Sequence, residues 1–337
     1  MLILDYSHHL YEPEATSPHP ISGKTHRSTA SPQHPESVAA FARWAAASAR
    51  HFHGRQVIWE IWNEPNGNFW SPKPDAPQYT TLALAACKAM REAEPQATII
   101  GPATSGFPWD FLETFLKSGV LEYLDGVSVH PYREQSRPPE TAAGDYQRLR
   151  KLIDRYAPAT RARIEILSGE WGYSSKEHGV PLEVQAAFAV RQQLANLLSG
   201  VPLSIWYDWK NDGPDPGENE HNFGTVLSDL KPKPAYIALK TMTRELAGCR
   251  LTRRIELPSP EDYGLLFAAA SGAQKIAAWT VSKPHSVKLD AKFYGQKNLA
   301  DVTGDGGSFN ARIESGELVL DLSSAPRYLI LPEAILK

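Results

Sequence analysis

The stretch Val57–Asn66 reads VIWEIWNEPN, and the rest of the chain is interpreted outward from it. Its first half is a β-branched and aromatic run, which predicts a short buried strand of a parallel sheet rather than a helix. Pro65 cannot donate to a sheet and biases Glu64 toward an extended backbone, so we expect the strand to end here. A carboxylate at the mouth of an apolar sheet is costly unless it has a function.

A second stretch, Ile164–Tyr173, has the same design and reads IEILSGEWGY. It is an apolar run that ends on Glu170, with glycine and aromatic residues on both sides. Two carboxyl groups at two strand ends, each among aromatic rings, suit the cleavage of a glycosidic bond. One of them gives a proton to the leaving oxygen, while the other stays ionised and attacks the anomeric carbon.

The composition is that of an ordinary globular protein and argues against several kinds of partner. The 337 residues are 42% hydrophobic and 22% charged, with a net charge of −3 and no basic block, so we expect no nucleic-acid partner. No apolar run reaches the roughly 18 residues of a membrane helix, so we expect no membrane partner. Cys87 and Cys249 lie far apart and are expected to be free thiols. Cys and His residues show no metal-ligand spacing, and we expect neither a metal nor an organic cofactor.

Strand and helix patterns alternate along the first 247 residues. Strands are expected at 2–6, 57–62, 98–101, 126–132, 164–168 and 203–207, and helices at 35–53, 76–94, 109–118, 144–156, 182–199 and 234–246. This alternation predicts an α/β fold, and the polar residues after the strand ends favour a (β/α)8 TIM-type barrel. The Pro-, Ser- and His-rich segment 11–33 has no apolar periodicity, and we expect it to be a long site-lining or mobile loop.

The sequence changes character after residue 247. Short runs at 265–270, 275–281, 286–289, 318–322 and 328–331 are separated by Gly, Pro, Ser and Asp, which predicts an antiparallel β-sandwich. We therefore expect two domains, a catalytic barrel over residues 1–247 and a β-sandwich over 248–337.

These residues together resemble the retaining glycoside hydrolases of clan A. The likeness rests on IWNEPN at 61–66, SGEWG at 168–172, VHPY at 129–132 and the trailing β-domain, and it covers nearly the whole chain. The closest likeness is to family 39, with its β-xylosidase, α-L-iduronidase and exopolysaccharide-cleaving members. The resemblance implies an enzyme that cleaves a β-glycosidic bond by double displacement.

The resemblance also implies roles for the two glutamates and their neighbours. Glu64 matches the general acid/base, with stacked rings and partial burial holding its proton, and Glu170 matches the nucleophile. Tyr132 is expected to hydrogen-bond Glu170, unless it is a strand-end tyrosine packed on a loop. Asn63 is expected to hold the sugar 2-hydroxyl, unless its side chain closes a local turn.

The remaining candidates for substrate binding each have a structural alternative. His130 is expected to orient the nucleophile side or contact the substrate, and a structurally satisfied histidine is nearly as good an interpretation. Trp209 is expected to lie under the reacting sugar. Trp70 and Trp171 are expected at outer subsites, with core packing as an equal alternative. The acidic residues at 208–220 suggest a cation site, although a solvated loop is favoured.

One departure from the resemblance affects the expected architecture. The strand at 57–62 would be strand four of the barrel, yet only the strand at 2–6 precedes it, so the first two βα units are missing. Either the reading frame starts late, or the barrel has about six units. No signal peptide is visible, and no location is assigned. Open strand edges seek partners, so we expect a homodimer in which each chain covers the other's open side.

A second function is compatible with the same residues. A chain that retains both glutamates but lacks the subsite walls of the missing units would be a catalytically impaired sugar-binding protein. Binding of sugars without hydrolysis would distinguish it from the enzyme.

Overall fold

A parallel sheet forms the centre of the first part of the computed structural model, which describes residues 1–19, 23–161, 163–290, 299–310 and 312–331. Its strand order is β1-β4-β5-β6-β7-β8. The strands are β1 (Leu2–Leu4), β4 (Ile58–Ile61), β5 (Thr98–Ser105), β6 (Gly126–His130), β7 (Glu165–Trp171) and β8 (Ser204–Trp206). Parallel registers join β1 to β4, β4 to β5, β5 to β6, and β6 to β7. The carboxyl ends of these strands therefore lie along one edge of the sheet.

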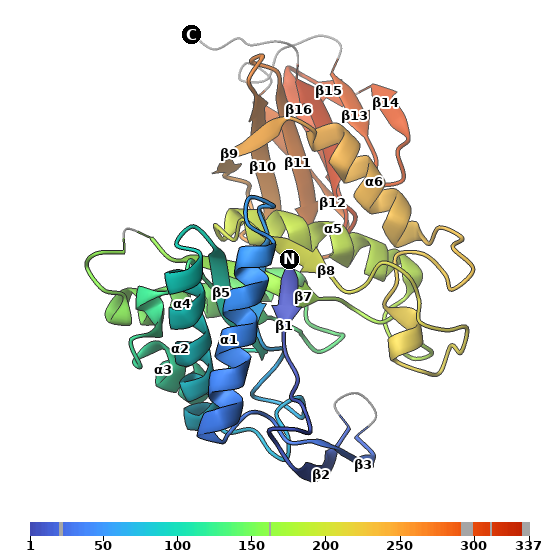
Figure 1. The fold of residues 1–337 in the computed structure, drawn as a ribbon. Coiled ribbons are helices and arrows are strands. Elements are labelled where there is room, and N and C mark those ends of the chain that lie inside the picture. Colours follow the sequence, from blue (N-terminus) through green and yellow to red (C-terminus); the bar gives the residue numbers. More distant parts are fainter. Residues whose placement is uncertain (20–22, 162, 291–298, 311, 332–337) are drawn as a thin grey trace. The chain divides into compact units, whose positions relative to one another are not determined.

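Helices alternate with the parallel strands, as the sequence pattern predicts. They are α1 (Pro35–His51), α2 (Ala76–Ala93), α3 (Trp109–Leu116) and α4 (Ala142–Tyr156), and α1 and α2 are side by side in Figure 1. Helix α2 begins where the Asp75 side chain accepts a hydrogen bond from the Gln78 amide, 2.9 Å away, which satisfies one of the free N–H groups of the first turn. Short 3-10 turns occupy Val120–Glu122, Pro139–Thr141 and Glu220–Asn222. The prediction of a partial (β/α) barrel of about six units is confirmed.

The segment between β1 and α1 differs from its prediction. It contains an antiparallel hairpin of β2 (Glu14–Pro18) and β3 (Thr25–Thr29), so the prediction of a loop at 11–33 was wrong. The sequence of β2, EATSP, offers no apolar alternation because few of its side chains are buried. Pairing across the hairpin, rather than burial of a face, holds these two strands together.

The second part of the chain contains two antiparallel sheets that share an apolar core. The larger sheet has the order β14-β13-β17-β11-β10-β9 and the smaller one β12-β16-β15. The strands are β9 (Cys249–Ile255), β10 (Asp262–Ala269), β11 (Gln274–Thr280), β12 (His285–Asp290), β13 (Ala300–Val302), β14 (Ser308–Asn310), β15 (Arg312–Glu314), β16 (Glu317–Leu322) and β17 (Arg327–Leu331). Side chains of both sheets, such as Ile276 and Leu320, meet in one buried cluster. The predicted β-sandwich is confirmed.

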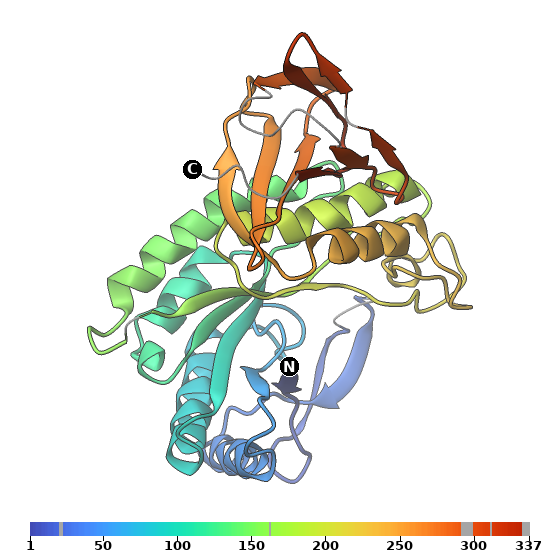
Figure 2. The ribbon, with the colours of Figure 1, turned by 90° about the horizontal axis from the view of Figure 1, so that it is seen from above.

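Two further helices cover the other face of the larger antiparallel sheet. They are α5 (Leu182–Leu198) and α6 (Pro234–Leu246), and Figure 2 shows them side by side beneath the orange strands β9–β11. Buried residues of α5 and α6 pack with Phe267, Trp279 and Tyr328 of the sheet. None of the helices in the described ranges has the length and apolarity of a membrane span.

The compact units of the chain are interleaved in sequence. One comprises Met1–Tyr132, Ala142–Trp171 and Val201–Ile205, and the other comprises Arg133–Thr141, Gly172–Gly200 and Trp206–Lys337. Helices α5 and α6 thus belong to the unit that holds the antiparallel sheets. The domain boundary at 247/248 stays a prediction, and the strand pattern changes from parallel to antiparallel close to it.

Candidate active site

The end of β4 turns sharply and presents two polar side chains. Trp62 and Glu64 both have left-handed backbone conformations, with φ of 71° and 43°. Each such residue costs about 1–3 kcal/mol and persists only where the surroundings fix it. Here the Trp62 amide donates to the Leu4 carbonyl at 2.8 Å, and the Glu64 amide donates to the Ala103 carbonyl at 3.0 Å. Neighbouring strands therefore hold Asn63 and Glu64 in a strained turn above the sheet.

His130, the last residue of β6, contacts Glu64 directly. Its Nδ1 atom lies 2.9 Å from Oε1 of Glu64, and its side chain is only 1% exposed. Burial lowers the pKa of His130, but the hydrogen bond with Glu64 and the charges of Glu170, Glu64 and Glu60 outweigh burial and raise that pKa above its ordinary value. A protonated ring would donate its Nδ1 proton to the Glu64 carboxylate. The sequence offered His130 as a residue of the nucleophile side, whereas its hydrogen bond is to Glu64.

Glu170 lies in β7 and accepts a hydrogen bond from Tyr132. The Tyr132 hydroxyl donates to Oε1 of Glu170 at 2.7 Å, a length typical of a bond to a charged acceptor. One oxygen each of Glu64 and Glu170 and one ring nitrogen of His130 all lie within 4.8 Å of one another. The same spacing would admit a cation, but Nδ1 of His130 already shares a hydrogen bond with Glu64. We interpret the group as a proton-transfer cluster.

Glu60 is a further carboxylate of this site, to which the sequence assigned no catalytic role. It is 0% exposed, and neither carboxylate oxygen has a hydrogen-bond partner of normal geometry among the described residues. Burial raises the pKa of Glu60, and the nearby His130 and Ser128 oppose that effect. A Cβ atom at Gly169 would lie 3.0 Å from Oε1 of Glu60 and 3.3 Å from Nε2 of His130. Glycine at position 169 therefore leaves the room in which these two side chains approach each other.

The other predicted substrate contacts have different surroundings. Asn63 is partly buried, and its Oδ1 atom has no hydrogen-bond partner among the residues that the structure describes. Trp70 and Trp171 are both 0% exposed, so neither ring offers a face to solvent in this structure. Trp209 belongs to the second unit, where it is 61% exposed and its ring lies 5.8 Å from that of Tyr236.

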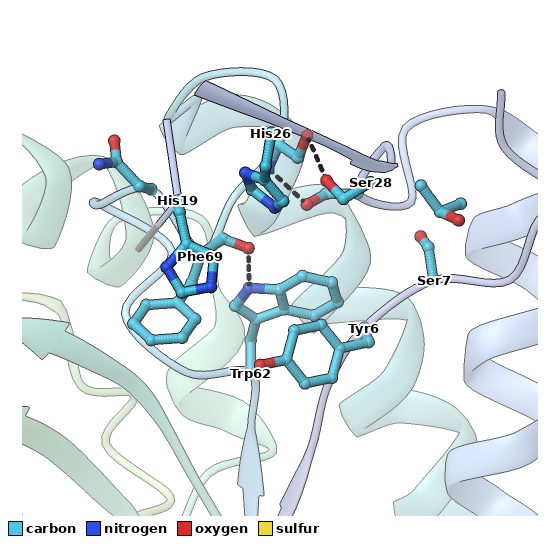
Figure 3. Close-up of a pocket in the computed structure, with 11 residues that line it drawn as sticks. Tyr6, Ser7, His19, His26, Ser28, Trp62 and Phe69 are labelled. Carbon is cyan, nitrogen blue, oxygen red and sulfur yellow. Dashed lines mark hydrogen bonds between the residues drawn. The ribbon is translucent and has the colours of Figure 1, made fainter. Parts of the chain in front are cut away.

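A cavity of about 300 Å³ lies beside Trp62 in the first unit and is drawn in Figure 3. Aromatic rings of Tyr6, Trp62 and Phe69 line it together with imidazole, amide and hydroxyl groups. Among the described residues that line it there is no Asp, Glu, Lys or Arg. The Oγ atom of Ser7 is buried there without a hydrogen-bond partner in the described ranges. The cavity thus suits an uncharged, hydroxyl-bearing ligand.

The hairpin β2–β3 forms one wall of this cavity and is attached through hydroxyl groups. Ser71, in the loop after β4, contacts Ser17 at 3.3 Å and Ser28 at 3.4 Å through its Oγ atom. Its amide donates to Oγ of Ser31 at 2.8 Å. The hairpin is therefore joined to the loop that carries Trp62, Glu64 and Phe69.

The acidic segment after β8 is held by bonds within its own unit. Asp215 accepts a hydrogen bond from the Gly217 amide at 2.9 Å, and Glu220 accepts one from the Tyr207 hydroxyl at 3.1 Å. In the described residues, the cluster with spacing suited to a cation is Glu64, His130 and Glu170, and not this segment.

The family description of the cellulases (glycosyl hydrolase family 5) matches residues 2–213. The chain therefore belongs to this family, within clan A of the glycoside hydrolases. Among solved structures, a family 39 glycoside hydrolase from Bacteroides cellulosilyticus WH2 has a TM-score of 0.77 and 25% identity, over 89% of this chain and 63% of that one. A family 39 β-xylosidase from Caulobacter crescentus has a TM-score of 0.61 and 19% identity, over 87% of this chain and 72% of that one.

Two curated relatives match a smaller part of the chain. A β-xylosidase of Caldicellulosiruptor saccharolyticus is 24% identical over 61% of this chain, and one of Geobacillus stearothermophilus is 23% identical over 55%. The chain spans only 44% and 40% of the lengths of these two enzymes. The resemblance to clan A and to family 39 is confirmed.

Proposed function

We propose that this chain hydrolyses a β-glycosidic bond with retention of configuration, with Glu170 as nucleophile and Glu64 as acid/base. The spacing of their oxygens, within 4.8 Å, is the observation that carries the proposal. Retaining enzymes have carboxyl groups about 5–5.5 Å apart, whereas inverting enzymes leave about 6.5–9.5 Å for a water molecule. The short spacing supports direct attack by one carboxylate.

In this mechanism Glu170 attacks the anomeric carbon while Glu64 gives its proton to the leaving oxygen. A covalent glycosyl-enzyme forms, and Glu64 then removes a proton from the water that hydrolyses it. Tyr132 donates a hydrogen bond to Glu170 and so favours its ionised form before attack. Oδ1 of Asn63, which has no hydrogen-bond partner among the described residues, would accept a bond from a sugar hydroxyl.

A panel of aryl β-glycosides, with the β-xyloside first because two relatives are named β-xylosidases, tests this function. We expect turnover with a β-configured first product, measured by NMR before mutarotation. Glu170→Gln should abolish the turnover, and the matched change Glu165→Gln, in the same strand, should not. Turnover that is equal in wild type and Glu170→Gln, or an α-configured product, would contradict the proposal. A chelator should leave the rate unchanged.

Rescue by azide assigns the two roles separately. Glu64→Ala should lose about 10²–10⁴-fold in rate, the usual contribution of a general acid. Azide should restore that variant by attacking the glycosyl-enzyme and giving a β-glycosyl azide. Azide with Glu170→Ala should give the α-product instead. Equal behaviour of the two variants would show that the roles are wrong.

We propose that the cavity beside Trp62 receives the sugar on the leaving side of the bond. Trp62 precedes Glu64 by two residues and Phe69 follows it in the same loop, and both line the cavity, which supports this assignment. Phe69→Ala should lower kcat/KM for a disaccharide but not for an aryl glycoside. Phe52→Ala, a half-exposed aromatic at the end of α1, is the control. Equal losses on both substrates would contradict this assignment.

The alternative of a sugar-binding protein without hydrolysis retains one supporting observation. The described parallel sheet has six strands, with β1 at one edge and β8 at the other, whereas a complete (β/α)8 barrel has eight. A titration in which xylose or xylobiose binds, while no aryl glycoside is cleaved, would favour binding over catalysis.

The homodimer stays a prediction. Strand β1 pairs with β4 on one side, and Leu2 and Ile3 are 43% and 41% exposed. Light scattering at micromolar concentration should give twice the mass of the chain if a second copy covers this edge. An active monomer would show that it does not.

A further inference from the structure

Glu60 carries an inference that goes beyond the two assigned carboxylates. It lies in β4, four residues before Glu64, and it is 0% exposed. Both of its oxygens lack hydrogen-bond partners of normal geometry among the described residues. Proteins pair buried carboxylates almost without exception because an unpaired one costs several kcal/mol. A buried carboxyl group that makes no hydrogen bond of normal geometry in the described residues, beside the Ser128 hydroxyl and the His130 ring, therefore calls for a functional explanation.

The group that Glu60 approaches is His130. Oε1 of Glu60 and Nε2 of His130 both lie next to the point where a side chain at Gly169 would begin, at 3.0 and 3.3 Å from it. Nε2 of His130 is buried and has no hydrogen-bond partner in the described part of the chain. The opposite ring nitrogen, Nδ1, is 2.9 Å from Glu64. The imidazole thus stands between two carboxyl groups, with Glu64 on one side and Glu60 on the other.

We propose that Glu60 is a positioning residue for the acid/base: it faces the Nε2 side of His130, keeps the ring protonated there, and so directs an Nδ1–H donor at Glu64. This inference rests on the proposed function. A neutral imidazole can present Nδ1 either as a donor or as an acceptor, and the second tautomer would face Glu64 with a lone pair. A carboxylate near Nε2 favours the doubly protonated ring, which donates from both nitrogens.

The charge on the ring has a consequence for each half of the reaction. When Glu64 gives its proton to the leaving oxygen it becomes a carboxylate, and a cationic His130 stabilises that charge at 2.9 Å. When Glu64 later takes a proton from water, the same hydrogen bond restrains its orientation. No proton has to leave the His130–Glu60 pair in either half, so the pair acts through Glu64.

Other titratable groups also face this pair and must be separated from Glu60 in any test. The charges of Glu170 and Glu64, like that of Glu60, raise the pKa of His130. Around Glu60 are the charges of His130, Glu170 and the amino group of Met1, and the hydroxyl of Ser128. Tyr79 of α2 is influenced by the charge of Glu60. Glu165 is paired with Arg163 at 3.0 Å and serves as the comparison.

The direct test is the titration of the His130 ring, followed by ¹⁵N NMR in the intact chain. Glu60→Gln removes a negative charge without changing size, so the pH midpoint of His130 should move down. Glu165→Gln, the matched change in β7, should leave that midpoint where it is in wild type. An unchanged midpoint in Glu60→Gln, or an equal shift in both variants, would overturn the proposal. This measurement needs no turnover and therefore remains decisive if the proposed function fails.

Turnover gives a second, independent readout. Glu60→Gln should lower kcat/KM by about 10-fold on a substrate that needs a proton at its leaving oxygen, which is a fraction of the full effect of a general acid. The loss should be smaller on a dinitrophenyl glycoside, and the upper pH limit of activity should fall together with the His130 midpoint. Equal losses on both substrates with an unmoved pH profile would indicate a structural role and overturn the proposal.

A wild-type measurement covers the case in which Glu60→Gln does not fold. In ¹³C-carboxyl-labelled wild-type protein, the Glu60 resonance should show a step at the pH where the His130 ring titrates, because interacting groups titrate as a pair. A Glu60 resonance that is silent at that pH would overturn the proposal.

Discussion

Glu60 and Glu140 are both buried glutamates, one in each unit of the chain, and their oxygens have opposite surroundings. Glu140 is 8% exposed. Its carboxylate accepts hydrogen bonds from Nε and Nη2 of Arg191, each at 2.8 Å, and from Nε1 of Trp279 at 2.7 Å. Glu60 is 0% exposed and has no hydrogen bond of normal geometry among the described residues. Glu140 thus joins a 3-10 turn, a helix and a sheet, so its charge stabilises the fold.

Hydrogen-bond donors around a buried carboxylate separate a structural glutamate from a functional one in this protein. Glu12 follows the structural pattern, since it accepts bonds from the Gln33 and His34 amides at 2.7 and 2.9 Å. A carboxylate that is saturated with donors cannot change its protonation easily, whereas an unpaired one beside an imidazole can. The comparison therefore predicts loss of stability at Glu140 and loss of site chemistry at Glu60.

The largest expected effect follows from breaking the Glu140 pair. Arg191→Met leaves a buried carboxylate without its cation and should lower the free energy of unfolding by about 3–5 kcal/mol. Denaturant titration measures it. Arg155→Met is the control, because Arg155 is 65% exposed and pairs with Glu113 at 3.6 Å, a surface contact worth about 0–1 kcal/mol. If the two changes cost the same, Glu140 is not the structural carboxylate described here.

The next effect concerns the hydrogen bond on Glu170. Tyr132→Phe removes a donor at 2.7 Å from a charged acceptor, a contact worth about 1.5–3 kcal/mol. We expect kcat on aryl glycosides to fall by roughly 10- to 100-fold, with little change in the free energy of unfolding. Steady-state kinetics and thermal melts together separate the two quantities. An unchanged kcat would mean that Tyr132 is a packed strand-end residue.

A smaller effect on stability is expected at Gly169, which lies beside Glu60. Gly169→Ala inserts a methyl group 3.0 Å from Glu60 and 3.3 Å from His130, and such overpacking costs about 1–3 kcal/mol. Gly144→Ala is the matched control, because nothing lies within 4 Å of its Cβ position in α4, and it should stabilise the helix by up to about 1 kcal/mol. Melting temperatures should therefore move in opposite directions. If Gly169→Ala leaves the melting temperature unchanged, the space beside Glu60 is not filled.

The last expected effect is a change in the pH dependence of stability. Burial raises the pKa of Asp5 from 3.8 to about 6, so the folded chain holds this proton more tightly than the unfolded chain does. The free energy of unfolding should then fall as the pH rises from about 4 to about 6 and stay level above that range. Asp5→Asn should flatten this part of the curve. A wild-type curve that rises across the same range without change in the variant would contradict this sign.

Much of the fold could be predicted from the sequence because its strongest signals are local. Apolar runs such as 57–62 and 164–168 became β4 and β7, and the six predicted helices lie within a few residues of α1 to α6. The hairpin β2–β3 could not be predicted, since its strands are polar and bury little. Strand β9 was missed for a similar reason, because four of its seven residues are exposed and three are arginines.

The candidate site was predicted in part. Strand ends identify Glu64 and Glu170, because parallel strands bring their carboxyl ends together. The position of Glu60 near His130 could not be read from the sequence, since it depends on how β4, β6 and β7 are placed in the sheet. The buried Trp70 and Trp171 illustrate a further limit, because a ring near a strand end reads the same whether it stacks on a sugar or on a neighbouring side chain.

The serine contacts of the hairpin have a consequence for handling this protein. Ser17, Ser28 and Ser31 meet Ser71 through neutral groups, so added salt has no charge there to screen. Small polyols such as glycerol offer the same hydroxyl chemistry in solution at molar concentration. We expect these serine contacts to tolerate high ionic strength but to weaken in glycerol. Kinetic constants measured with and without glycerol should then differ most for substrates whose leaving group is a sugar.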